Sequence, residues 1–397
     1  MKPVMEGGTP MELLALIESP GHVCSRYRIE AFKPILKRFG VRLTIEAIES
    51  NALRRFAQMR SAHLYDSVIL QRKLLDSISF SILRRAARNL VFDFDDAVLY
   101  RDSYSLKGPY CEKRKARFER IVSNADTVLA GNSFLASRAE MHGAKPEAVH
   151  FMPTCIPLAQ YESAKRAQKA DRNDPFVMVW IGSSSTLKGL EATSKIWNSI
   201  GEAVPNAVLR VVCDRFPKFK SMRVEPISWS QSIEIDQIVS ADIGISHVPD
   251  DLWSRGKCGL KVLQYLAGGL PVLTNPVGVH AEMVKSGETG FLVDKTREWV
   301  EAIRWLSDNR QSRIEMGHNA IETIRQGYDV ADWGLHFVDR VMPGAVPSNS
   351  LDQFDANSYP SGALKSLGGW KLDHKSNQMG LSSGNHWQVG KTGGVRP

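Results

Sequence analysis

The stretch VMVWIGSSSTLKGLEATSKIW, residues 177–197, decides how the rest of the chain is interpreted. Its apolar run ends at Gly182 and is followed by a Ser/Thr-rich turn and an amphipathic segment, which predicts a buried strand and then a helix. Small residues in such a turn let backbone N–H groups approach an anion, and a helix N-terminus adds a favourable dipole. We expect Lys188 at the opening of this helix, so Gly182, Ser183 and Lys188 are candidate phosphate-binding residues. The alternative is an ordinary strand–helix turn in which Thr186 caps the helix.

A second segment, HVPDDLWSRGKCGLKVLQYLAGGLPVLTNPVG (residues 247–278), places a glycine-rich basic turn before another amphipathic helix. Such a turn brings two cations and open backbone to a helix N-terminus that faces an anion. A glutamine one turn into the helix can hydrogen-bond hydroxyl groups in both directions. The alternatives are that Asp250 and Asp251 only form a turn and that the glutamine lies on the surface. The candidate anion-binding and hydroxyl-binding residues of this segment are Asp251, Arg255, Gly256, Lys257, Cys258, Gly259 and Gln264.

Around these two segments, short apolar runs alternate with longer amphipathic stretches, which is typical of an α/β fold with parallel sheets. Strands are predicted at 13–18, 41–48, 67–71, 90–94, 127–131 and 148–153, and again at 176–182, 207–213, 242–248, 270–275 and 290–293. Helices are predicted at 26–39, 50–60, 75–88, 111–124 and 132–142, and again at 188–201, 231–240, 259–268, 279–286, 296–307 and 309–340.

The pattern predicts two similar α/β domains with a ligand-binding cleft between them. We assign residues 1–165 to the first domain and 172–324 to the second, joined through the polar stretch 162–175. Residues 344–397 are rich in Gly, Ser and Asn without periodicity, so we expect a disordered tail.

In the first domain, LVFDFDD (residues 90–96) places Asp93, Asp95 and Asp96 at the end of a predicted strand. A carboxylate cluster there could position a hydroxyl group, act as a base or bind a metal. The alternative is loop capping and ion pairing with arginines such as Arg101.

Three further residues follow predicted strands of the first domain. Gly21 and Arg26 come after the first strand, and Arg72 comes directly after the third. The carboxyl ends of parallel strands form the functional edge of such sheets, so these residues could hold a phosphate or an acceptor.

Composition narrows the function classes. The chain has 397 residues and a formal net charge of +8, but residues 1–170 hold 27 basic and 18 acidic residues, a charge of +9. The first domain therefore carries the whole positive excess, which favours an anionic partner such as a lipid phosphate or a membrane leaflet. A solvated helix face is the alternative. No nucleic-acid-binding motif accompanies the charge.

Five cysteines without a CxxC pair indicate a reduced, cytoplasmic protein without zinc.

As a set, these motifs resemble glycosyltransferase family 4 over about residues 12–340. The resemblance rests on the GxxxxxKG pattern of Gly182–Gly189, on GLKVLQYLAGGLPVLTNPVG, and on SGETGFLV; further landmarks are SRYRIEAFKPIL, YDSVILQR, VFDFDDA and HFMPTCI. WIGSxST, PDDxWSRGKCG and DFDDA together resemble one branch of that family. The resemblance implies a GT-B architecture, with two facing Rossmann-like domains and a final helix, about residues 325–341, that returns to the first domain.

The same resemblance implies transfer of a sugar with retention from a nucleotide-sugar donor, without a bound metal or other cofactor. Two positions depart from the family pattern. Ser183 stands where many members have an arginine on the diphosphate, and Gly256 and Gln264 stand in place of two glutamates. We therefore expect Lys188 to act with Arg255 or Lys257 on the leaving diphosphate, and Asp95 or Asp96 to orient a substrate.

The expected partners are a nucleoside-diphosphate sugar and an anionic or lipid-linked saccharide acceptor of cell-envelope polysaccharide synthesis. We expect peripheral contact with the inner face of the membrane and no nucleic acid. Two alternatives remain open: a nucleotide-sugar-binding or scaffold protein without turnover, and a nucleotide-sugar epimerase of the same fold.

Overall fold

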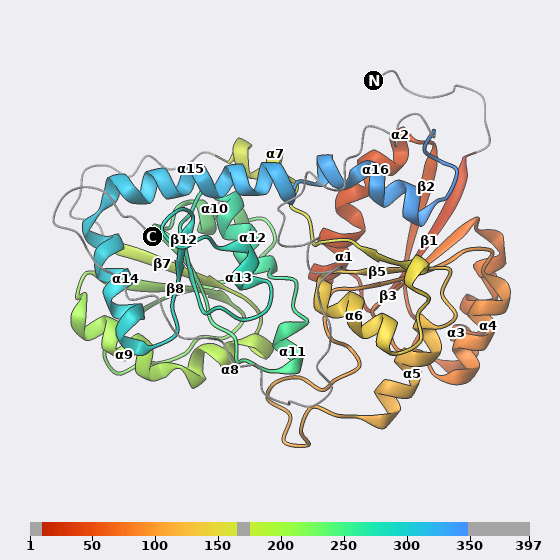
Figure 1. Cartoon of the computed structure of the whole chain (residues 1–397), viewed down its shortest axis with the longest axis horizontal. Helices are drawn as coiled ribbons and strands as arrows, with labels where there is room; N and C mark the ends of the chain where they lie inside the picture. Colours follow the sequence, from red (N-terminus) through yellow and green to blue (C-terminus); the bar gives the residue numbers. More distant parts are fainter. Residues whose placement is uncertain (1–9, 165–174, 348–397) are drawn as a thin grey trace.

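Two domains lie side by side, each built around a parallel sheet of six strands (Figure 1). The fold is taken from a computed structural model that describes residues 10–164 and 175–347. Both sheets are covered by helices on their two faces, and every strand pair within them is parallel. This arrangement confirms the prediction of an α/β protein with two Rossmann-like domains.

The sheet of the first domain has the order β2-β1-β3-β4-β5-β6. Its strands are β1 (Met11–Ile17), β2 (Val41–Ala47), β3 (Ser67–Gln71), β4 (Leu90–Phe94), β5 (Thr127–Ala130) and β6 (Val149–Phe151). The helices are α1 (Val23–Arg28), α2 (Lys33–Arg38), α3 (Ala52–Ser61), α4 (Ser77–Ala86), α5 (Glu112–Val122), α6 (Ser133–Met141) and α7 (Leu158–Ser163), with 3-10 turns at Glu30–Phe32, Ala62–Leu64 and Pro146–Ala148.

The second sheet has the order β12-β11-β10-β7-β8-β9. Its strands are β7 (Phe176–Ile181), β8 (Ala207–Cys213), β9 (Arg223–Ser228), β10 (Ile243–Ser246), β11 (Val272–Thr274) and β12 (Gly290–Leu292). The helices are α8 (Ser184–Ala192), α9 (Ser194–Ala203), α10 (Glu234–Val239), α11 (Leu252–Arg255), α12 (Leu260–Ala267), α13 (His280–Met283), α14 (Thr296–Asp308), α15 (Arg310–Gly327) and α16 (Val330–Val341).

Short polar side chains fix where the helices begin. Asn51, Asp76 and Asn132 accept hydrogen bonds from the first backbone amides of α3, α4 and α6. Such caps satisfy amides that have no partner inside the helix. Because each of these helices follows a strand of a parallel sheet, its N-terminus lies at the carboxyl edge of that sheet, where the cleft opens.

The structure divides three of the predicted helices. The helix predicted at 26–39 breaks at Ile29 and restarts at α2, whose first turn contains Pro34; proline is tolerated there because the first helical amides have no partner inside the helix. The helix predicted at 188–201 divides at Thr193 into α8 and α9, and the one predicted at 309–340 divides at Tyr328 into α15 and α16.

Three elements were not predicted from the sequence. Strand β9 is mostly exposed or half-buried and contains Pro226, so it lacks the apolar pattern of a core strand, and it lies at a sheet edge, where proline is accommodated. Helices α7 and α11 are short, with six and four residues.

The chain crosses between the domains twice, at the same place. It leaves the first domain near Ile156, and Leu158 and Tyr161 of α7 already pack in the core of the second. It returns after Tyr328, and the two passages pair: the amide of Ile156 donates to the carbonyl of Tyr328 at 2.8 Å, and the amide of Val330 donates to Ile156 at 3.0 Å.

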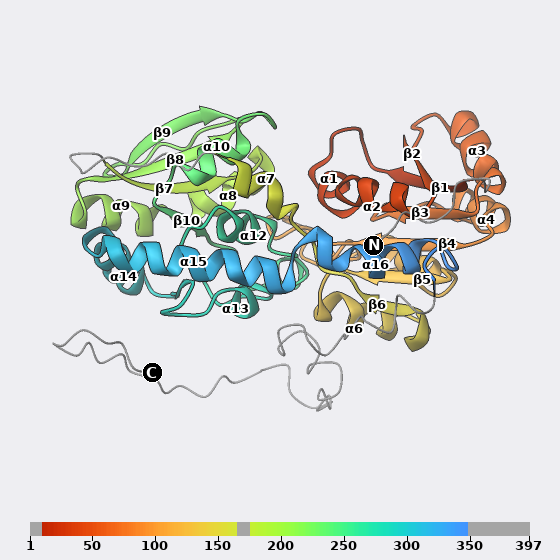
Figure 2. The ribbon, with the colours of Figure 1, turned by 90° about the horizontal axis from the view of Figure 1, so that it is seen from above.

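Helix α16 then packs on the first domain. Figure 2 shows α15 and α16 following one another across the two domains. Phe337 stacks on Phe32 with ring centroids 4.2 Å apart, and Trp333 is buried in the same cluster. The predicted linker 162–175 falls largely on residues 165–174, and the predicted tail falls from residue 348 onward, outside the described residues. In the described part of the chain, no helix is long and apolar enough to cross a bilayer.

Candidate active site

A cleft of about 910 Å³ lies between the two domains. The loops that follow strands β1, β3 and β4 line it from the first domain, and those that follow β7, β8 and β10 line it from the second. Ligands of parallel α/β sheets bind at this carboxyl edge, so the cleft is the candidate active site. Of the predicted site residues, those that line it are Gly21, Arg72, Asp95, Asp96, Gly182, Ser183, Lys188, Lys257, Cys258, Gly259 and Gln264.

The turn after β7 forms one wall of the cleft. A β-carbon on Gly182 would meet the ring of Trp180 and the hydroxyl of Thr186, so only glycine fits there. Helix α8 begins at Ser184, which corrects the expectation that Lys188 opens the helix: Lys188 lies in its second turn. The Ser184 amide at the helix N-terminus donates to the Asp214 carboxylate at 2.7 Å. The first amide of α8 is therefore already bound to an anionic group of the protein.

Lys261, the second residue of α12, was not singled out from the sequence. It lines the cleft, and its ammonium lies 3.5 Å from the hydroxyl oxygen of Thr186 and 5.0 Å from the centre of the Trp180 ring. Among the residues that the structure describes, no carboxylate oxygen lies within 4 Å of it. Burial, and then the charge of Lys257, lower the pKa of Lys261 to about 7. A desolvated cation without an anionic partner is costly, which makes this the natural place for an anion.

The sequence signal that could have identified Lys261 is its position in the first turn of the predicted helix. It lies at the N-terminal end of α12, on the turn after Gly259, which has the left-handed conformation with φ of 65°. The expectation for the segment concentrated on the Arg255–Lys257 pair because those cations precede the helix.

Arg255 and Asp251 do not line the cleft, although Ser254 and Lys257 of the same segment do. The Arg255 guanidinium forms an ion pair with Asp250 at 2.7 Å and is substantially exposed, and Asp251 caps α11 by accepting from the Ser254 amide. The structure therefore corrects the expectation that Arg255 lines the cleft beside Lys257. The hydrogen bonds of Asp250 and Asp251 agree with the alternative, in which these two residues only form a turn.

Gln264 is buried rather than free for a hydroxyl group. Its amide nitrogen donates to Glu234 at 2.8 Å and to the Tyr27 hydroxyl at 3.0 Å. Glu234 also accepts two hydrogen bonds from Arg26 and one from Trp229. The sequence did not single out Glu234, because it lies on the short helix α10, far from the other motifs.

Arg26, which was predicted for the acceptor side, forms hydrogen bonds within this network. It spans the two domains to reach Glu234 at 2.8 Å and does not line the cleft. Gly21 does line the cleft, in a left-handed conformation with φ of 69°, which favours glycine.

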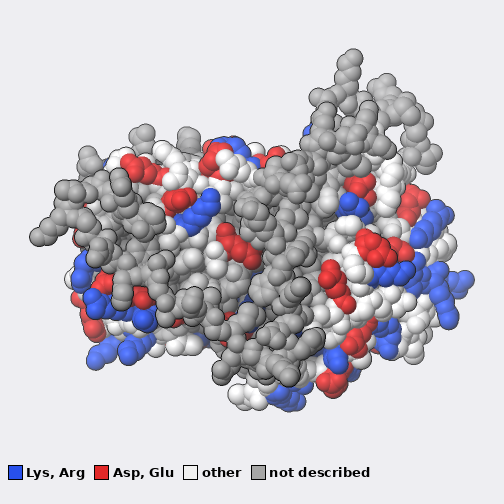
Figure 3. All heavy atoms as spheres, in the orientation of Figure 1, with Lys and Arg blue, Asp and Glu red and all other residues white. Residues whose placement is uncertain are grey.

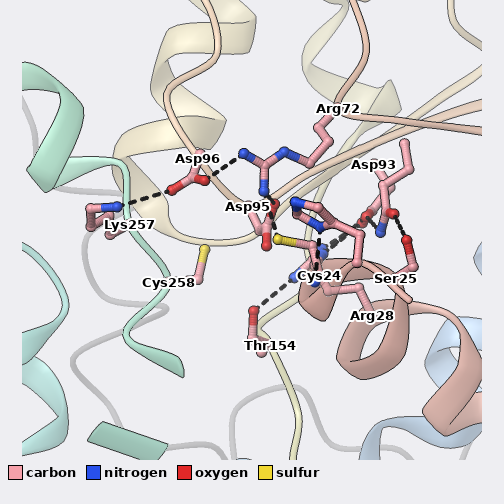
Figure 4. A network of polar contacts seen from close by, with 12 residues as sticks. Cys24, Ser25, Arg28, Arg72, Asp93, Asp95, Asp96, Thr154, Lys257 and Cys258 are labelled. Atoms are coloured by element: carbon pink, nitrogen blue, oxygen red, sulfur yellow. Dashed lines mark hydrogen bonds and ion pairs between the residues drawn. The ribbon is translucent and has the colours of Figure 1, made fainter. Parts of the chain in front are cut away.

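The carboxylates after β4 divide into two groups (Figure 4). Asp93 is buried and receives hydrogen bonds from Arg28, whose guanidinium also reaches the Met152 carbonyl at 2.9 Å. Asp95 and Asp96 face the cleft, and both pair with Arg72, at 3.3 and 2.7 Å. Burial alone would raise the pKa of Asp95, but the charges of Arg72 and Arg28 outweigh it and hold that pKa below its usual range. Asp95 is therefore a carboxylate at neutral pH.

The ion-pairing alternative thus accounts for part of this cluster, with Arg28 and Arg72 as partners in place of Arg101. Among the described ranges 10–164 and 175–347, no three His, Cys, Asp or Glu side chains are grouped so as to hold a metal ion. All five cysteines are free.

The basic turn that precedes α12, residues 255–259, also packs against the first domain. A β-carbon on Gly256 would collide with Ala97, and one on Gly131 would collide with the sulfur of Cys258. Cys258 is counted in the core cluster of the first domain, and the Lys257 ammonium lies 3.7 Å from Asp96. The side chain of Asn132 donates to the Lys257 carbonyl at 3.0 Å. The turn is thus wedged between the loops after β4 and β5, and it holds the cleft closed at this end.

Two more lining residues were not found from the sequence. His247, after β10, has a buried Nδ1 without a hydrogen-bond partner among the described residues, and burial lowers its pKa. Tyr104, in the long loop before α5, reaches Gly189 of α8, where its hydroxyl leaves no room for a β-carbon. A strand-end histidine and a loop tyrosine belong to no motif, so only their position identifies them.

The comparisons with known proteins agree with this geometry. Residues 250–323 match the family described as "Glycosyl transferases group 1". A D-inositol 3-phosphate glycosyltransferase of Pseudarthrobacter chlorophenolicus is 26% identical over 53% of this chain and 54% of its own length, and one of Corynebacterium glutamicum is 26% identical over 57% and 59%. The chain thus spans a little over half the length of these curated relatives.

Solved structures match over more of the chain. Anabaena Alr3699/HepE in complex with UDP and glucose has a TM-score of 0.58 and 16% identity over 83% of this chain and 98% of its own. A glycosyltransferase from Rickettsia africae has a TM-score of 0.61 and 12% identity over 85% and 100%. Two facing Rossmann-like domains of this kind define the GT-B class. Residues 250–323 are thus similar to the group 1 glycosyltransferases, and the fold of the chain is that of the GT-B class.

Proposed function

We propose that this chain is a retaining glycosyltransferase that moves a sugar from a nucleoside-diphosphate donor to a hydroxyl group of an acceptor. The observation that carries the proposal is the composition of the cleft. Lys188, Lys257 and Lys261 enter it from the second domain, and Asp95 and Asp96 face them from the first. The UDP-bound structure of the similar Anabaena protein supports a nucleoside diphosphate as the donor's leaving group.

The lysines would stabilise the charge that develops when the bond between sugar and diphosphate breaks. Preorganised positive groups aimed at a leaving oxygen are often the largest contribution to such catalysis. In this proposal Lys261 takes over the role of the arginine that Ser183 replaces, because it is a desolvated cation with no carboxylate within 4 Å among the described residues. The helix N-terminus at Gly259–Leu260 adds its dipole to the same region.

The carboxylates would act on the acceptor side. Arg72 holds Asp95 and Asp96 in place, and a fixed carboxylate can accept a hydrogen bond from an incoming hydroxyl group or from a hydroxyl of the donor sugar. We assign neither as a nucleophile. Together with Gly21, Arg72 marks the first-domain wall as the acceptor side.

The acceptor in this proposal is anionic or lipid-linked, as in the synthesis of cell-envelope polysaccharides. Its support is the charge of +9 on residues 1–170, which the local needs of a diphosphate in the second domain do not explain. The curated relatives are also named after a phosphorylated compound, D-inositol 3-phosphate.

A donor panel tests the proposal. The full chain is incubated with UDP-, GDP- and dTDP-sugars, and the melting temperature and the slow hydrolysis of each donor are measured. A donor present at 100 times its Kd stabilises the fold by about 2.7 kcal/mol. We expect one donor class to raise the melting temperature and to be hydrolysed, and Lys188→Met and Lys261→Met to reduce both effects. Lys285→Met is the control, because Lys285 is exposed and lies outside the cleft.

Three outcomes would contradict the proposal. Binding without turnover on any acceptor would indicate a nucleotide-sugar-binding protein. Interconversion of the donor sugar without an acceptor would indicate an epimerase. Equal behaviour of the wild type and both cleft variants would remove the cleft lysines from the site.

A further inference from the structure

One face of the first domain combines exposed apolar side chains with exposed arginines. We call it the α3–α4 face: the outward sides of α3 and α4, with Leu53, Phe56, Arg60, Ile78 and Arg85. Leu53 is 82% exposed, Ile78 74% and Phe56 49%. Large apolar side chains exposed this far are costly in water when they are grouped, and such groups mark contact surfaces.

The two helices present their side chains in the same direction. Both follow strands of one sheet and cover the same face of it, and both pack into the same core cluster through Met59, Phe80 and Leu83. They contact one another: Arg55 of α3 donates to the Ser79 hydroxyl of α4 at 3.1 Å. Their sides away from this core therefore form one continuous surface.

Each helix repeats the same arrangement on that surface. Leu53 precedes Arg60 by seven residues in α3, and Ile78 precedes Arg85 by seven residues in α4. A spacing of seven returns to the same side of a helix. Each apolar residue thus lies near the N-terminus of its helix and each arginine near the C-terminus.

The charged side chains that α3 and α4 themselves contribute to this surface are all basic. Residues 51–64 and 77–88 contain six arginines and neither Asp nor Glu. Arg55, Arg84 and Arg88 pair with carboxylates of neighbouring segments. The other three, Arg54, Arg60 and Arg85, have no carboxylate within 4 Å among the residues that the structure describes. Figure 3 shows several Lys and Arg at the right-hand end of the molecule, where Figure 1 places α3 and α4, with Asp and Glu of the neighbouring surface beside them.

We infer that the α3–α4 face docks on an anionic lipid bilayer, with Leu53, Phe56 and Ile78 entering the interface and Arg60 and Arg85 meeting lipid phosphates. Apolar side chains among cations on an amphipathic helix suit the boundary between headgroups and acyl chains. A second copy of the chain fits poorly, because two faces of the same charge repel. This inference deepens the proposed function, on which it rests for the presence of a lipid-linked acceptor.

The position of the face relative to the cleft agrees with such an acceptor. The N-termini of α3 and α4 lie at the carboxyl edge of the first sheet, and the strand that precedes α4 ends next to Arg72, in the cleft. The apolar residues therefore lie toward the cleft and the arginines away from it. A bilayer on this face would present a lipid-linked hydroxyl group beside the first-domain wall.

Vesicle flotation with the full chain tests the inference. The vesicles are phosphatidylcholine alone or phosphatidylcholine with about a third phosphatidylglycerol, at 0.05 M and 0.5 M salt. We expect flotation only with the anionic vesicles at low salt, because surface charge attraction decays within a Debye length. Leu53→Ser/Ile78→Ser and Arg60→Gln/Arg85→Gln should each lower the partition coefficient at least tenfold.

Matched controls separate this face from general changes. Met141→Ser and Arg297→Gln remove an exposed apolar and an exposed basic residue elsewhere, and both should bind as the wild type does. Nucleotide-induced thermal shifts should be unchanged in all variants, since none of these residues lines the cleft, so a failure here is distinguishable from a failure of the proposed donor site. Equal binding of wild type and face variants would overturn the inference. So would binding to neutral vesicles only, or a concentration-dependent dimer that the same substitutions abolish without any flotation.

Discussion

The sulfur of Cys258, in the second domain, occupies the position that a β-carbon on Gly131 of the first domain would need. This contact seals one end of the cleft, together with the ion pair between Lys257 and Asp96. The two domains can therefore approach this closely only because residue 131 is a glycine. The basic turn serves two purposes, since its lysine enters the cleft while its cysteine is packed in the first-domain core.

Gly131→Ala should prevent full closure. The added methyl group collides with Cys258, and overpacking of a close contact costs about 1–3 kcal/mol. In the presence of UDP, we expect the variant to have a larger radius of gyration in small-angle scattering than the wild type. We also expect its kcat/KM to be lower by about tenfold or more.

The collision itself is tested by a second substitution. Cys258→Ala removes the sulfur, so Gly131→Ala/Cys258→Ala should recover closure and most of the lost activity. A double variant that behaves no better than Gly131→Ala would show that the loss has another origin.

Lys261→Met should weaken binding of the nucleoside diphosphate. A charge-assisted hydrogen bond contributes about 1.5–3 kcal/mol, which corresponds to a rise in Kd of about ten- to a hundredfold. Lys261→Arg should retain part of the affinity. Titration calorimetry with UDP measures the effect, and Lys285→Met is the control. An unchanged Kd in Lys261→Met would exclude contact between this ammonium and the diphosphate.

Donor affinity should also fall as the pH rises. The pKa of Lys261 is about 7 in the free protein, so the ammonium loses its proton as the pH passes that value. A bound anion favours the charged form and raises this pKa, so binding takes up a proton between pH 7 and the new pKa. We expect the affinity for UDP-glucose, or for the sugar nucleotide found in the panel, to decrease by up to about tenfold per pH unit in that window. Lys261→Arg remains charged and should lose this pH dependence.

Arg28→Met should destabilise the first domain. Arg28 and Asp93 are 1% and 2% exposed, and they are joined by an ion pair. Removal of one partner of a buried pair leaves a desolvated charge and costs about 3–5 kcal/mol. Urea unfolding followed by circular dichroism measures the loss. Arg42→Met, which breaks the largely exposed pair with Glu12, should change stability by less than about 1 kcal/mol.

The order of the elements was accessible from the sequence because apolar runs and polar turns alternate strictly in both domains. Strands β3, β4 and β8 begin and end where the pattern placed them. Strand β9 carries no such pattern, since an edge strand is half solvated. The apolar pattern runs on through the break between α15 and α16, and only the resemblance indicated a separate final helix at about 325–341. The structure fixes the break by the Asp329 cap and by a hydrogen bond from the Ile156 amide, more than 170 residues earlier.

The candidate site was predicted in its segments but not in its pairings. The pattern located the turns after β4 and β7 and the turn before α12. It could not show that Arg255 turns to Asp250, that Arg26 and Gln264 meet at Glu234, or that Lys261 lies beside Thr186. These contacts join residues from different loops or domains, and local sequence carries no information about which cation finds a carboxylate nearby.

The paired passages at Ile156 and Tyr328 limit how the domains can move. The two segments form a short parallel bridge, and its two backbone hydrogen bonds hold them together where the chain passes between the domains. The bridge can therefore act as a pivot. Twisting and separation are resisted there, while bending about the pair costs little. A change of the angle at this bridge would open or close the cleft, and it would move a substrate bound to one wall toward the opposite wall.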